Sequence, residues 1–382
     1  MPHQFVKCAY NIPERKAMPQ SESKRVLFGT SAWGLGHATR DLILMKGLLD
    51  RGCSLTVVST GNALRVIRGE LGDAARYLDW PDIPTTVART KPGFYAKTVA
   101  SIPRIIETWH QERRHLDRLL RAERFDLIVS DHRNGLIRRD IPSYYITHSP
   151  RYIAPWRDPV METVMEWFLA RWFSPVKGIL IPDDEEGGMS GEMSHSVRFI
   201  PQEKLTYLGI LSSVQRRDDL PQDIDYFITI SGPEPQRTLF AARVLSQLDR
   251  LSGRIVVALG DPGGTAPPPP RDGIEIHPYL DRARQEEMLN RARLVVCRSG
   301  YTTLMELAEL GKRALIVPTP GQSEQEYLAK TLRDRGIFYS VRQHELDLGR
   351  DTAIASSYPG YTPAHPTRES VARFLDVVLS GG

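Results

Sequence analysis

A histidine stands directly after a short glycine-rich turn near the start of the chain. The turn, Gly34-Leu35-Gly36, follows the apolar run 25–33, and His37 then begins a stretch with helical spacing of apolar residues. Small residues at a helix start expose backbone N–H groups, which together with the helix dipole attract an anion. Histidine is a common general base because its pKa lies near neutrality. The glycines could also serve only to make a tight turn, but the histidine favours a functional site.

The turn does not match the dinucleotide-binding pattern. That pattern requires G-x-G-x-x-G after a strand, followed about 20 residues later by an acidic residue. Neither feature is present in this stretch of the sequence. A nicotinamide-dependent dehydrogenase is therefore poorly supported.

A second group of polar residues lies between residues 298 and 326. Ser299 and Gly300 open a predicted helix, whose N-terminus can hold a diphosphate. Glu306 follows about one and a half turns later, within reach of a ribose diol. Gln325 and Glu326 begin another helix after the next strand and can bind sugar hydroxyls. Glu306 alone would indicate only a solvated helix face, but the whole set, placed after successive strands, predicts a nucleotide-sugar site.

Further polar residues follow the strands expected in the first half of the chain. Asp131 and His132 come directly after the run 125–130, and His148 follows the next strand. Asp131 and His132 are candidates for a second base or for an acceptor contact. The acidic run 183–186 could suggest a metal site, but we interpret it as a solvated loop.

Apolar runs alternate with helical stretches along the whole chain, which predicts an α/β fold with parallel sheets. The pattern restarts at about residue 225, so we expect two doubly wound, Rossmann-like halves that face each other across a cleft. Ligands bind beyond the carboxyl ends of such strands. The predicted divisions are a loose leader at 1–23, a first domain at 24–215, a second domain at 216–355, and a segment at 356–382 whose helix packs back toward the first domain.

The individual elements follow from the same pattern. The expected strands lie within residues 25–33, 54–61, 125–132, 143–149, 177–183, 204–211, 225–232, 253–260, 274–280, 293–300 and 313–320. The expected helices cover 37–52, 236–251, 281–292, 301–311, 323–336 and 367–379, with a solvated basic helix at 104–124. Residues 345–366 show no periodicity.

Composition excludes several classes of protein. The chain has 382 residues, of which 41% are hydrophobic and 25% charged, which is typical of a globular protein rather than a collagenous, coiled-coil or disordered one. A net charge of +4 is too small to argue for nucleic-acid binding. The three cysteines (Cys8, Cys53, Cys297) are too widely spaced for a disulfide framework or a CxxC metal site. No apolar run reaches the ~18 residues of a spanning helix, so we expect a cytoplasmic protein that meets a membrane only from its surface.

Residues 277–336 resemble the nucleotide-sugar half of GT-B glycosyltransferases, in particular family 28, with its MurG-like UDP-GlcNAc transferases and diacylglycerol galactosyltransferases. The spacing of that family is kept at Thr302, Glu306, Gly311, Val317-Pro318, Gln325 and Gly336. The stretches GLGHATR (34–40), SGPEPQRT (231–238) and IPSYYITHSP (141–150) resemble its glycine-rich turn, its phosphate loop and the strand before its acceptor region. Two positions depart from the family pattern, because Glu326 replaces the second residue of a Gln-Gln pair and Ser149 replaces an acidic residue.

The resemblance implies an inverting glycosyltransferase that moves a sugar from a UDP-sugar to a hydroxyl acceptor, with UDP-GlcNAc as candidate donor and a lipid-linked molecule among the candidate acceptors. The first domain would bind the acceptor and the second the donor. His37 would be the base, Asp131 a second catalytic residue, and His132 and His148 acceptor contacts. Donor contacts would come from Gly36, Ser231, Gly232, Tyr279, Leu280, Arg298, Ser299, Gly300, Thr302, Glu306, Gln322, Gln325 and Glu326. No metal or other cofactor and no nucleic acid is implied, and Arg298 could instead anchor its loop.

Residues 152–176 hold three of the six tryptophans. Apolar side chains fall near one helical face, at Val160, Val164, Trp167, Phe168 and Trp172. Such a helix could dip into the inner face of a membrane to reach a lipid-linked acceptor. The interpretation we favour at this stage is a helix that packs in the core or lines the acceptor site.

Two other functions remain open from the sequence. One is a UDP-GlcNAc epimerase or hydrolase of the GT-B fold, which would need extra carboxylates in the cleft, for example Glu234 and Glu326. The other is a nucleotide-sugar-binding protein without catalysis.

Overall fold

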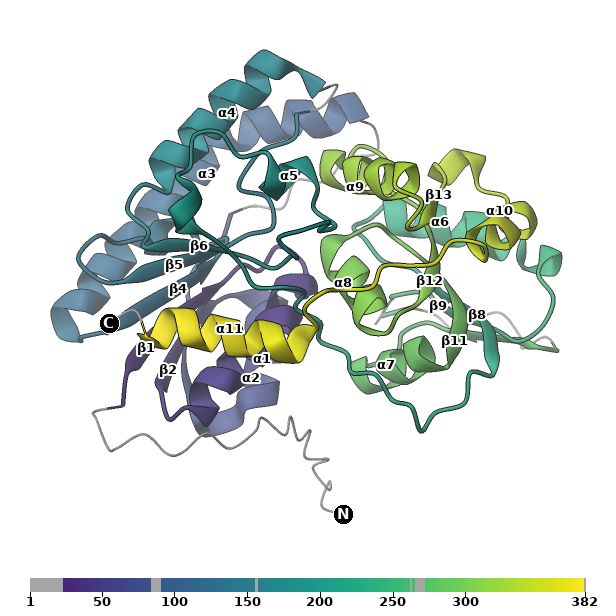
Figure 1. The fold of residues 1–382 in the computed structure, drawn as a ribbon, viewed down its shortest axis with the longest axis horizontal. Coiled ribbons are helices and arrows are strands. Elements are labelled where there is room, and N and C mark those ends of the chain that lie inside the picture. The colour runs from purple at the N-terminus through teal and green to yellow at the C-terminus, as the bar shows by residue number, and fades with distance from the viewer. Residues whose placement is uncertain (1–22, 84–90, 155–156, 262, 265–271, 381–382) are drawn as a thin grey trace.

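Two parallel β-sheets with helices packed against them lie side by side in the molecule (Figure 1). The computed structural model describes residues 23–83, 91–154, 157–261, 263–264 and 272–380. The predicted α/β class and its two doubly wound units are confirmed. The predicted leader at 1–23 lies almost wholly outside the described residues.

The first sheet has seven parallel strands in the order β3-β2-β1-β4-β5-β6-β7. Its central strands are near-continuous apolar runs because both faces are covered by helices. Every residue of β4 is buried, as is every residue of β1 after Arg25. The strands are β1 (Arg25–Thr30), β2 (Ser54–Ser59), β3 (Ala75–Asp79), β4 (Leu127–Asp131), β5 (Ser143–Ile146), β6 (Gly178–Ile181) and β7 (Leu205–Tyr207).

The second sheet repeats this architecture with six parallel strands in the order β10-β9-β8-β11-β12-β13. Its centre consists of the same kind of apolar run, and β9 is buried throughout. The strands are β8 (Ile224–Thr229), β9 (Ile255–Ala258), β10 (Ile274–His277), β11 (Ala292–Cys297), β12 (Arg313–Ile316) and β13 (Tyr339–Ser340).

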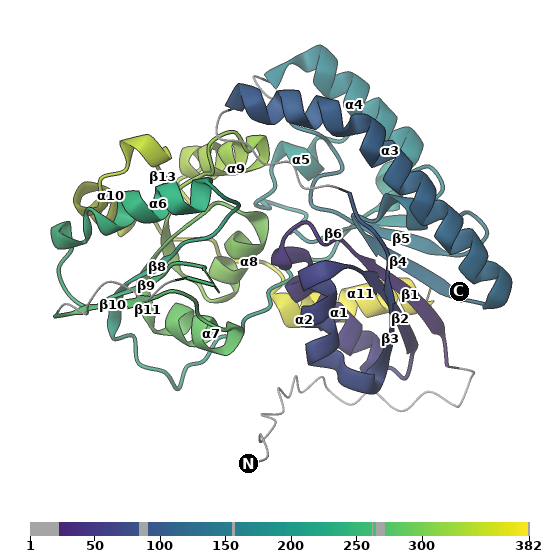
Figure 2. The ribbon, with the colours of Figure 1, turned by 180° about the vertical axis from the view of Figure 1, so that it is seen from behind.

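Helices connect the strands and cover the sheets. They are α1 (Leu35–Asp50), α2 (Gly61–Leu71), α3 (Lys91–Ala122), α4 (Pro159–Trp172), α5 (Glu192–His195), α6 (Gln236–Leu245), α7 (Arg282–Arg291), α8 (Tyr301–Glu309), α9 (Ser323–Asp334), α10 (Leu348–Ala355) and α11 (Thr367–Ser380). The long helices α3 and α4 lie together on the outer side of the first unit in both views (Figures 1 and 2). Helix α8 faces the first unit from the second.

The last helix, α11, returns to the first unit and packs on α1. The two helices approach closely at Gly47, where an added Cβ would lie 3.1 Å from Val371 and 3.3 Å from Leu375. Phe374, Leu375 and Val378 are buried in this contact region. The chain therefore crosses between the units twice, once before β8 and once before α11.

The expected elements are largely present, with differences of a few residues at their ends. Each expected strand run contains a strand, although the run 204–211 contributes only the three residues of β7. Residues 345–366, which lack periodicity, nevertheless contain α10. That helix begins after Asp347, whose side chain accepts a hydrogen bond from the Arg350 backbone N–H, so its signal is a capping residue rather than an apolar pattern.

Candidate active site

The strand order reverses between β1 and β4 in the first sheet, and between β8 and β11 in the second. Loops that leave such a point run to opposite sides and open a crevice where ligands bind. In the first unit the crevice is flanked by residues 36–37, after β1, and by Asp131, the last residue of β4. In the second it is flanked by residues 231–232 and 298–300. The predicted site residues therefore occupy the two positions at which such folds bind ligands.

His37 lies in the first turn of α1 and its Nδ1 is 3.0 Å from Oδ2 of Asp131. Arg40 also binds Asp131, with N–O distances of 2.7 to 3.0 Å. Nη2 of Arg40 also lies 2.9 Å from this Nδ1. Because Arg40 already donates to both oxygens of Asp131, we assign the Nδ1 proton of His37 to its contact with Asp131, an assignment made from the hydrogen-bond network and not from an observed hydrogen. The lone pair of Nε2 is then available to accept a proton, as a histidine base requires.

Asp131 has no exposed surface, so it orients His37 and cannot itself meet a substrate. This corrects the interpretation of Asp131 as a second base. Burial alone would raise its pKa, but Arg40 and His37 hold the pKa of Asp131 well below its usual range. The carboxylate is therefore ionised whenever the protein is folded near neutral pH.

Asp41 is a second buried carboxyl beside Arg40. Burial and the neighbouring Asp131 charge raise the pKa of Asp41 well above its usual range. The hydroxyl of Thr30 donates a hydrogen bond to it at 2.8 Å. Arg40, Asp131 and neutral Asp41 together carry one positive and one negative charge, so this buried cluster contains no uncompensated ion.

His132 follows Asp131 and is one of two described residues other than glycine with a positive φ, at 55°. Such strain costs on the order of 1 kcal/mol and is concentrated at functional sites. Its ring meets His37 edge-on, with 5.0 Å between the ring centroids. Burial and the nearby His37 lower the pKa of His132 to about 3, so the ring is neutral. Its Nε2 is buried without a hydrogen-bond partner among the described residues.

His148, after β5, reaches across to the second unit. Its ring stacks on Tyr301 of α8, with 4.1 Å between centroids and an interplanar angle of 5°. Its Nε2 lies 3.2 Å from Oε1 of Glu324, in the first turn of α9. Burial would raise the pKa of Glu324, but the neighbouring His148 lowers it to about 2. Glu324 was not among the predicted site residues, because nothing in its local sequence indicates a partner 176 positions away.

The first turn of α8 contacts the glycine-rich turn of the first unit. Gly300 is the N-cap of α8, and a Cβ added at Gly36 would lie 2.5 Å from Oγ1 of Thr302. Only glycine fits at position 36, so the start of α1 and the start of α8 meet in direct contact. Ser299 is buried, and its hydroxyl donates to the carbonyl of Gln325 at 2.9 Å.

Arg298 anchors loops of the second unit. Its guanidinium donates to the carbonyls of Val317, Pro318 and Gln236 and lies 4.1 Å from the centre of the Phe240 ring. Burial lowers the pKa of Arg298 to about 9. These contacts fit the anchoring role and not a direct donor contact.

Glu306 lies on α8, in contact with Ser213 of the segment that connects the two units. The hydroxyl of Ser213 donates to its Oε1 at 3.0 Å. Burial outweighs this hydrogen bond and raises the pKa of Glu306 to about 7. Ser213 was missed by the sequence analysis because it belongs to the connecting segment rather than to a recognisable motif. A carboxylate beside a hydroxyl can accept hydrogen bonds from a ribose diol.

Side chains in the first turn of α9 form hydrogen bonds with the loop that precedes this helix, residues 319–322. Oε1 of Gln325 accepts the Thr319 backbone N–H at 2.9 Å, and its Nε2 donates to Oε1 of Gln322 at 2.6 Å. Oε1 of Glu326 accepts the Gly321 N–H at 3.0 Å. The side chains expected to bind the sugar are thus brought together in one turn, next to Ser299.

The remaining predicted donor residues are on the rim of the second unit. Ser231 and Gly232 are exposed at the turn after β8, where the φ of 108° at Gly232 requires glycine. Tyr279 exposes half of its ring, whereas Leu280 is buried. An exposed ring beyond a strand end can stack on a base, while Leu280 can contribute only backbone.

The acidic run 183–186 is only partly solvated, which corrects the sequence interpretation. Asp183 and Asp184 are buried because distant groups satisfy their oxygens. Asp183 accepts the Met189 and Ser190 backbone N–H groups at 2.8 Å. Asp184 accepts the Tyr361 hydroxyl and the His365 N–H at 2.8 and 3.0 Å. Across the described residues, no group of three or more His, Cys, Asp or Glu side chains is arranged to hold a metal ion.

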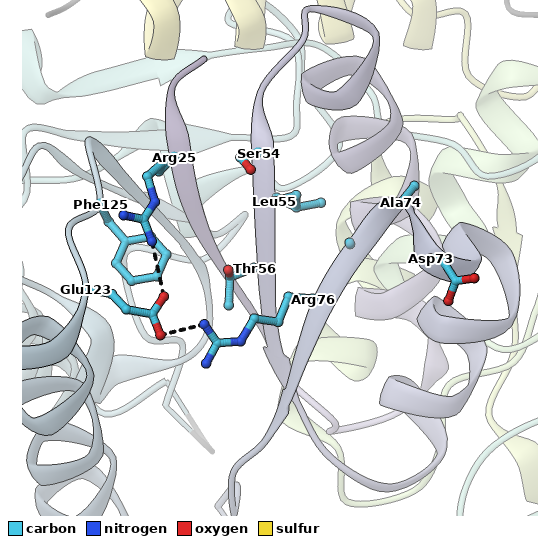
Figure 3. Close-up of a pocket in the computed structure, with 10 residues that line it drawn as sticks. Arg25, Ser54, Leu55, Thr56, Asp73, Ala74, Arg76, Glu123 and Phe125 are labelled. Carbon is cyan, nitrogen blue, oxygen red and sulfur yellow. Dashed lines mark hydrogen bonds and ion pairs between the residues drawn. The ribbon is translucent and has the colours of Figure 1, made fainter. Parts of the chain in front are cut away.

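A polar hollow of about 370 Å³ lies at the opposite end of the first sheet (Figure 3). Arg25, Ser54 and Ala75, which line it, are the first residues of β1, β2 and β3. Arg25 and Arg76 both bind Glu123 there. Because the strands present their amino ends there, and ligands of such folds bind at the carboxyl ends, this hollow does not belong to the site.

Comparison with known families shows one matching domain. Residues 266–352 match the glycosyltransferase family 28 C-terminal domain. Two curated relatives are UDP-N-acetylglucosamine–N-acetylmuramyl-(pentapeptide) pyrophosphoryl-undecaprenol N-acetylglucosamine transferases. The one from Histophilus somni is 41% identical over 78 residues, which is 20% of this chain and 21% of the relative. The one from Desulforudis audaxviator is 37% identical over 86 residues, 22% of each chain. The aligned segments span about a fifth of the curated relatives.

Solved structures resemble nearly the whole chain. The glycosyltransferase of kitacinnamycin has a TM-score of 0.63 at 13% identity, covering 94% of this chain and 96% of its own. MurG of Acinetobacter baumannii has a TM-score of 0.57 at 16% identity, covering 94% and 99%. These likenesses confirm the two-domain GT-B fold.

Proposed function

Because residues 266–352 are a family 28 C-terminal domain within a GT-B fold, we propose that the protein is an inverting glycosyltransferase that uses a UDP-sugar. The observation that carries the proposal is the His37–Asp131 pair, which lies where the start of α1 meets the start of α8. A base and an anion-binding helix end are thereby adjacent. A direct inverting displacement uses a base for the acceptor hydroxyl, and a helix N-terminus can stabilise the departing diphosphate.

The proposed reaction is a single displacement. Nε2 of His37 takes the proton of the acceptor hydroxyl as its oxygen attacks the anomeric carbon of the donor. The bond from that carbon to the diphosphate breaks, its electron pair leaves with UDP, and the configuration inverts. Backbone N–H groups at the start of α8 stabilise the departing charge. Asp131 stabilises the imidazolium that forms.

The donor would be held by the second domain. Glu306 and Ser213 suit the ribose, the ring of Tyr279 suits the base, and the first turn of α9 suits the sugar. The names of the curated relatives make UDP-GlcNAc the first donor to test. We propose that the UDP-sugar is a co-substrate and that neither a metal nor another cofactor takes part.

The epimerase or hydrolase alternative gains little support. Glu234 binds Arg237 and Thr238, and Glu326 accepts the Gly321 N–H. Both carboxylates therefore have local partners. The His37–Asp131 pair, in turn, gives no reason to favour a protein without catalysis.

We further propose that the acceptor is presented at a lipid surface, on the basis of α4. Five apolar side chains of this helix are exposed, with fractions of 40% to 71% at Val160, Met161, Val164, Trp167 and Phe168. Trp172, at its end, is half-buried and packs on Trp109. The charged residues Glu162 and Glu166 of the helix point inward and are buried. This part of the helix reverses the usual arrangement of an amphipathic helix. It contradicts the expectation that the apolar face packs in the core, whereas the expectation that the helix lines the acceptor site stays a prediction.

The buried glutamates of α4 are held by arginines. Arg151 and Arg157 bind Glu162 at 3.0 and 2.9 Å, and Arg198 binds Glu166 at 2.8 Å. Ion pairs therefore hold the inner face of the helix, and part of its apolar face is exposed. Arg171, an exposed arginine of the same helix, and the exposed tryptophan suit an anionic membrane interface. In the described ranges no helix is both long and apolar enough to cross a bilayer.

The catalytic proposal is tested by replacing His37 with alanine. We expect turnover of UDP-GlcNAc, followed as UDP release in the presence of membrane lipid extract, to fall at least about a hundredfold, while the dissociation constant of UDP stays unchanged. His110→Ala, on the exposed side of α3, is the matched control. Unchanged turnover in His37→Ala would refute the mechanism. Titration with UDP, GDP and dTDP, with and without magnesium, tests the donor, and selective UDP binding without the metal is expected.

The membrane contact is tested with vesicles of phosphatidylglycerol and phosphatidylcholine. The double substitution Val164→Ser, Trp167→Ser should weaken co-sedimentation at least about tenfold, because two exposed apolar side chains are removed. Leu239→Ser, at an exposed leucine of α6 in the second domain, should have no effect. Equal binding by all three proteins would refute this surface.

A further inference from the structure

His148 is the residue through which the first domain touches both anion-attracting helix ends of the second. Its ring lies flat on Tyr301, the first residue of α8, and its Nε2 faces Glu324, the second residue of α9. The side chain is only 6% exposed. The imidazole is therefore fixed from both sides at the junction of the domains.

Neither ring nitrogen of His148 has a hydrogen-bond partner among the described residues, since the approach of Glu324 to Nε2 is an ion-pair contact without hydrogen-bond geometry. Nδ1 is buried, and among the described residues no hydrogen-bonding group reaches it. An unpaired buried polar atom is costly and calls for a specific explanation. Beside a helix N-terminus, the group that best satisfies an imidazole N–H is an anionic oxygen.

Three groups of other elements face His148. Glu324 of α9 is the carboxylate in contact with it, and Tyr301 of α8 stacks on its ring. His132, after β4, lies 6.5 Å away between centroids and is neutral.

We propose that His148 donates a hydrogen bond from Nδ1 to the diphosphate of the bound nucleotide, and that Glu324, opposite Nε2, holds the ring in the orientation for this contact. This inference rests on the proposed function and assigns His148 to the donor rather than to the acceptor. The leaving diphosphate then receives a hydrogen bond from the first domain as well as from the helix ends of the second. The contact exists only when the two domains are together.

The test measures UDP and uridine binding by calorimetry at pH 7, because uridine lacks the diphosphate. His148→Gln removes the group at the Nδ1 position, and we expect UDP binding to weaken about 10- to 100-fold with uridine binding unchanged. His148→Asn loses the same ring stacking but places an amide nitrogen near the Nδ1 position, so it should retain more UDP affinity than His148→Gln. Equal weakening of UDP and uridine, or equal effects of the two substitutions, would overturn the proposal.

Glu324→Ala tests the positioning of the ring, because it removes the carboxylate that lies 3.2 Å from Nε2 of His148. We expect UDP binding to weaken while uridine binding stays unchanged, and Glu324→Gln, whose amide can still reach Nε2, should retain more UDP affinity than Glu324→Ala. Equal UDP affinity of Glu324→Ala and wild type would overturn the role of Glu324. Failure of the wild-type protein to bind either uridine or UDP would instead overturn the proposed function, and this contact with it.

Discussion

Replacing Asp131 with asparagine removes the negative charge that Arg40 and His37 share. Arg40 is 1% exposed and makes its shortest contacts with Asp131. Removing one partner of a buried ion pair usually costs about 3–5 kcal/mol. Here a second carboxyl group, that of Asp41, can replace the lost charge, because its Oδ1 lies 3.9 Å from Nε of Arg40. The Asp131 charge helps to keep Asp41 protonated, so in Asp131→Asn the Asp41 carboxyl can ionise. We therefore expect the free energy of unfolding to fall by only about 1–2 kcal/mol.

A double-mutant cycle with Asp41→Asn measures this compensation. Asp41→Asn alone replaces a neutral group with another that still accepts the Thr30 hydrogen bond, and should cost less than about 1 kcal/mol. The double variant leaves the Arg40 guanidinium without either carboxylate and should lose about 4 kcal/mol. The coupling between the two sites would then be about 2 kcal/mol, measured by urea denaturation of all four proteins at pH 7. If the losses of unfolding free energy in the two single variants simply added up in the double variant, Asp41 would not compensate for the missing Asp131 charge.

Asp131→Asn also distinguishes the orientation of His37 from the binding of UDP. In Asp131→Asn, we expect turnover of UDP-GlcNAc to fall at least about a hundredfold because the His37 proton is no longer held on Nδ1. UDP affinity, measured by calorimetry, should stay within about twofold of wild type. Wild-type turnover in this variant would show that His37 does not depend on the pair.

Three further predictions concern other parts of the molecule. Because the pKa of Glu306 is about 7, its ionised fraction should rise up to about tenfold from pH 6 to pH 8, and the affinity for uridine should rise with it. A wild-type affinity that is independent of pH and identical to that of Glu306→Gln would contradict the role of Glu306. Gly36→Ala drives a methyl group into Thr302 and should lower turnover about tenfold or more, with partial recovery in the double variant with Thr302→Ala; Gly69→Ala, where the added methyl meets nothing, is the control. Asp184→Asn weakens the contacts to residues 361–365 and should lower the thermal midpoint by several degrees, consistent with a loss of about 1–3 kcal/mol; an unchanged midpoint would show that these hydrogen bonds do not stabilise the fold.

The sequence predicted the sheets well because their strands are local signals. Runs such as residues 26–28 and 294–297 are continuously apolar, and a strand buried on both faces requires that pattern. The glycine turns and helix starts of the site could be placed for the same reason, since ligands bind at the ends of such strands. Helix α10 was missed because it has no long apolar stripe.

The partners of the site residues could not be predicted, because they come from distant parts of the chain. Glu324 meets His148, and Ser213 meets Glu306, only after the two domains have come together. Asp184 is buried by groups 177 to 181 positions further along. The outward face of α4 was judged wrongly because its sequence shows the apolar stripe but not the arginines that hold Glu162 and Glu166.

The return of α11 to the first unit affects the order in which the protein can fold during synthesis. The face of α1 around Gly47 is completed by Val371 and Leu375, more than 300 residues later in the chain. Because synthesis adds about 5–20 residues per second, this apolar face of α1 stays uncovered for tens of seconds while the second unit is synthesised. The first domain to be synthesised is therefore the last to be completed, and a chaperone that shields an exposed helix face would act on it during this interval.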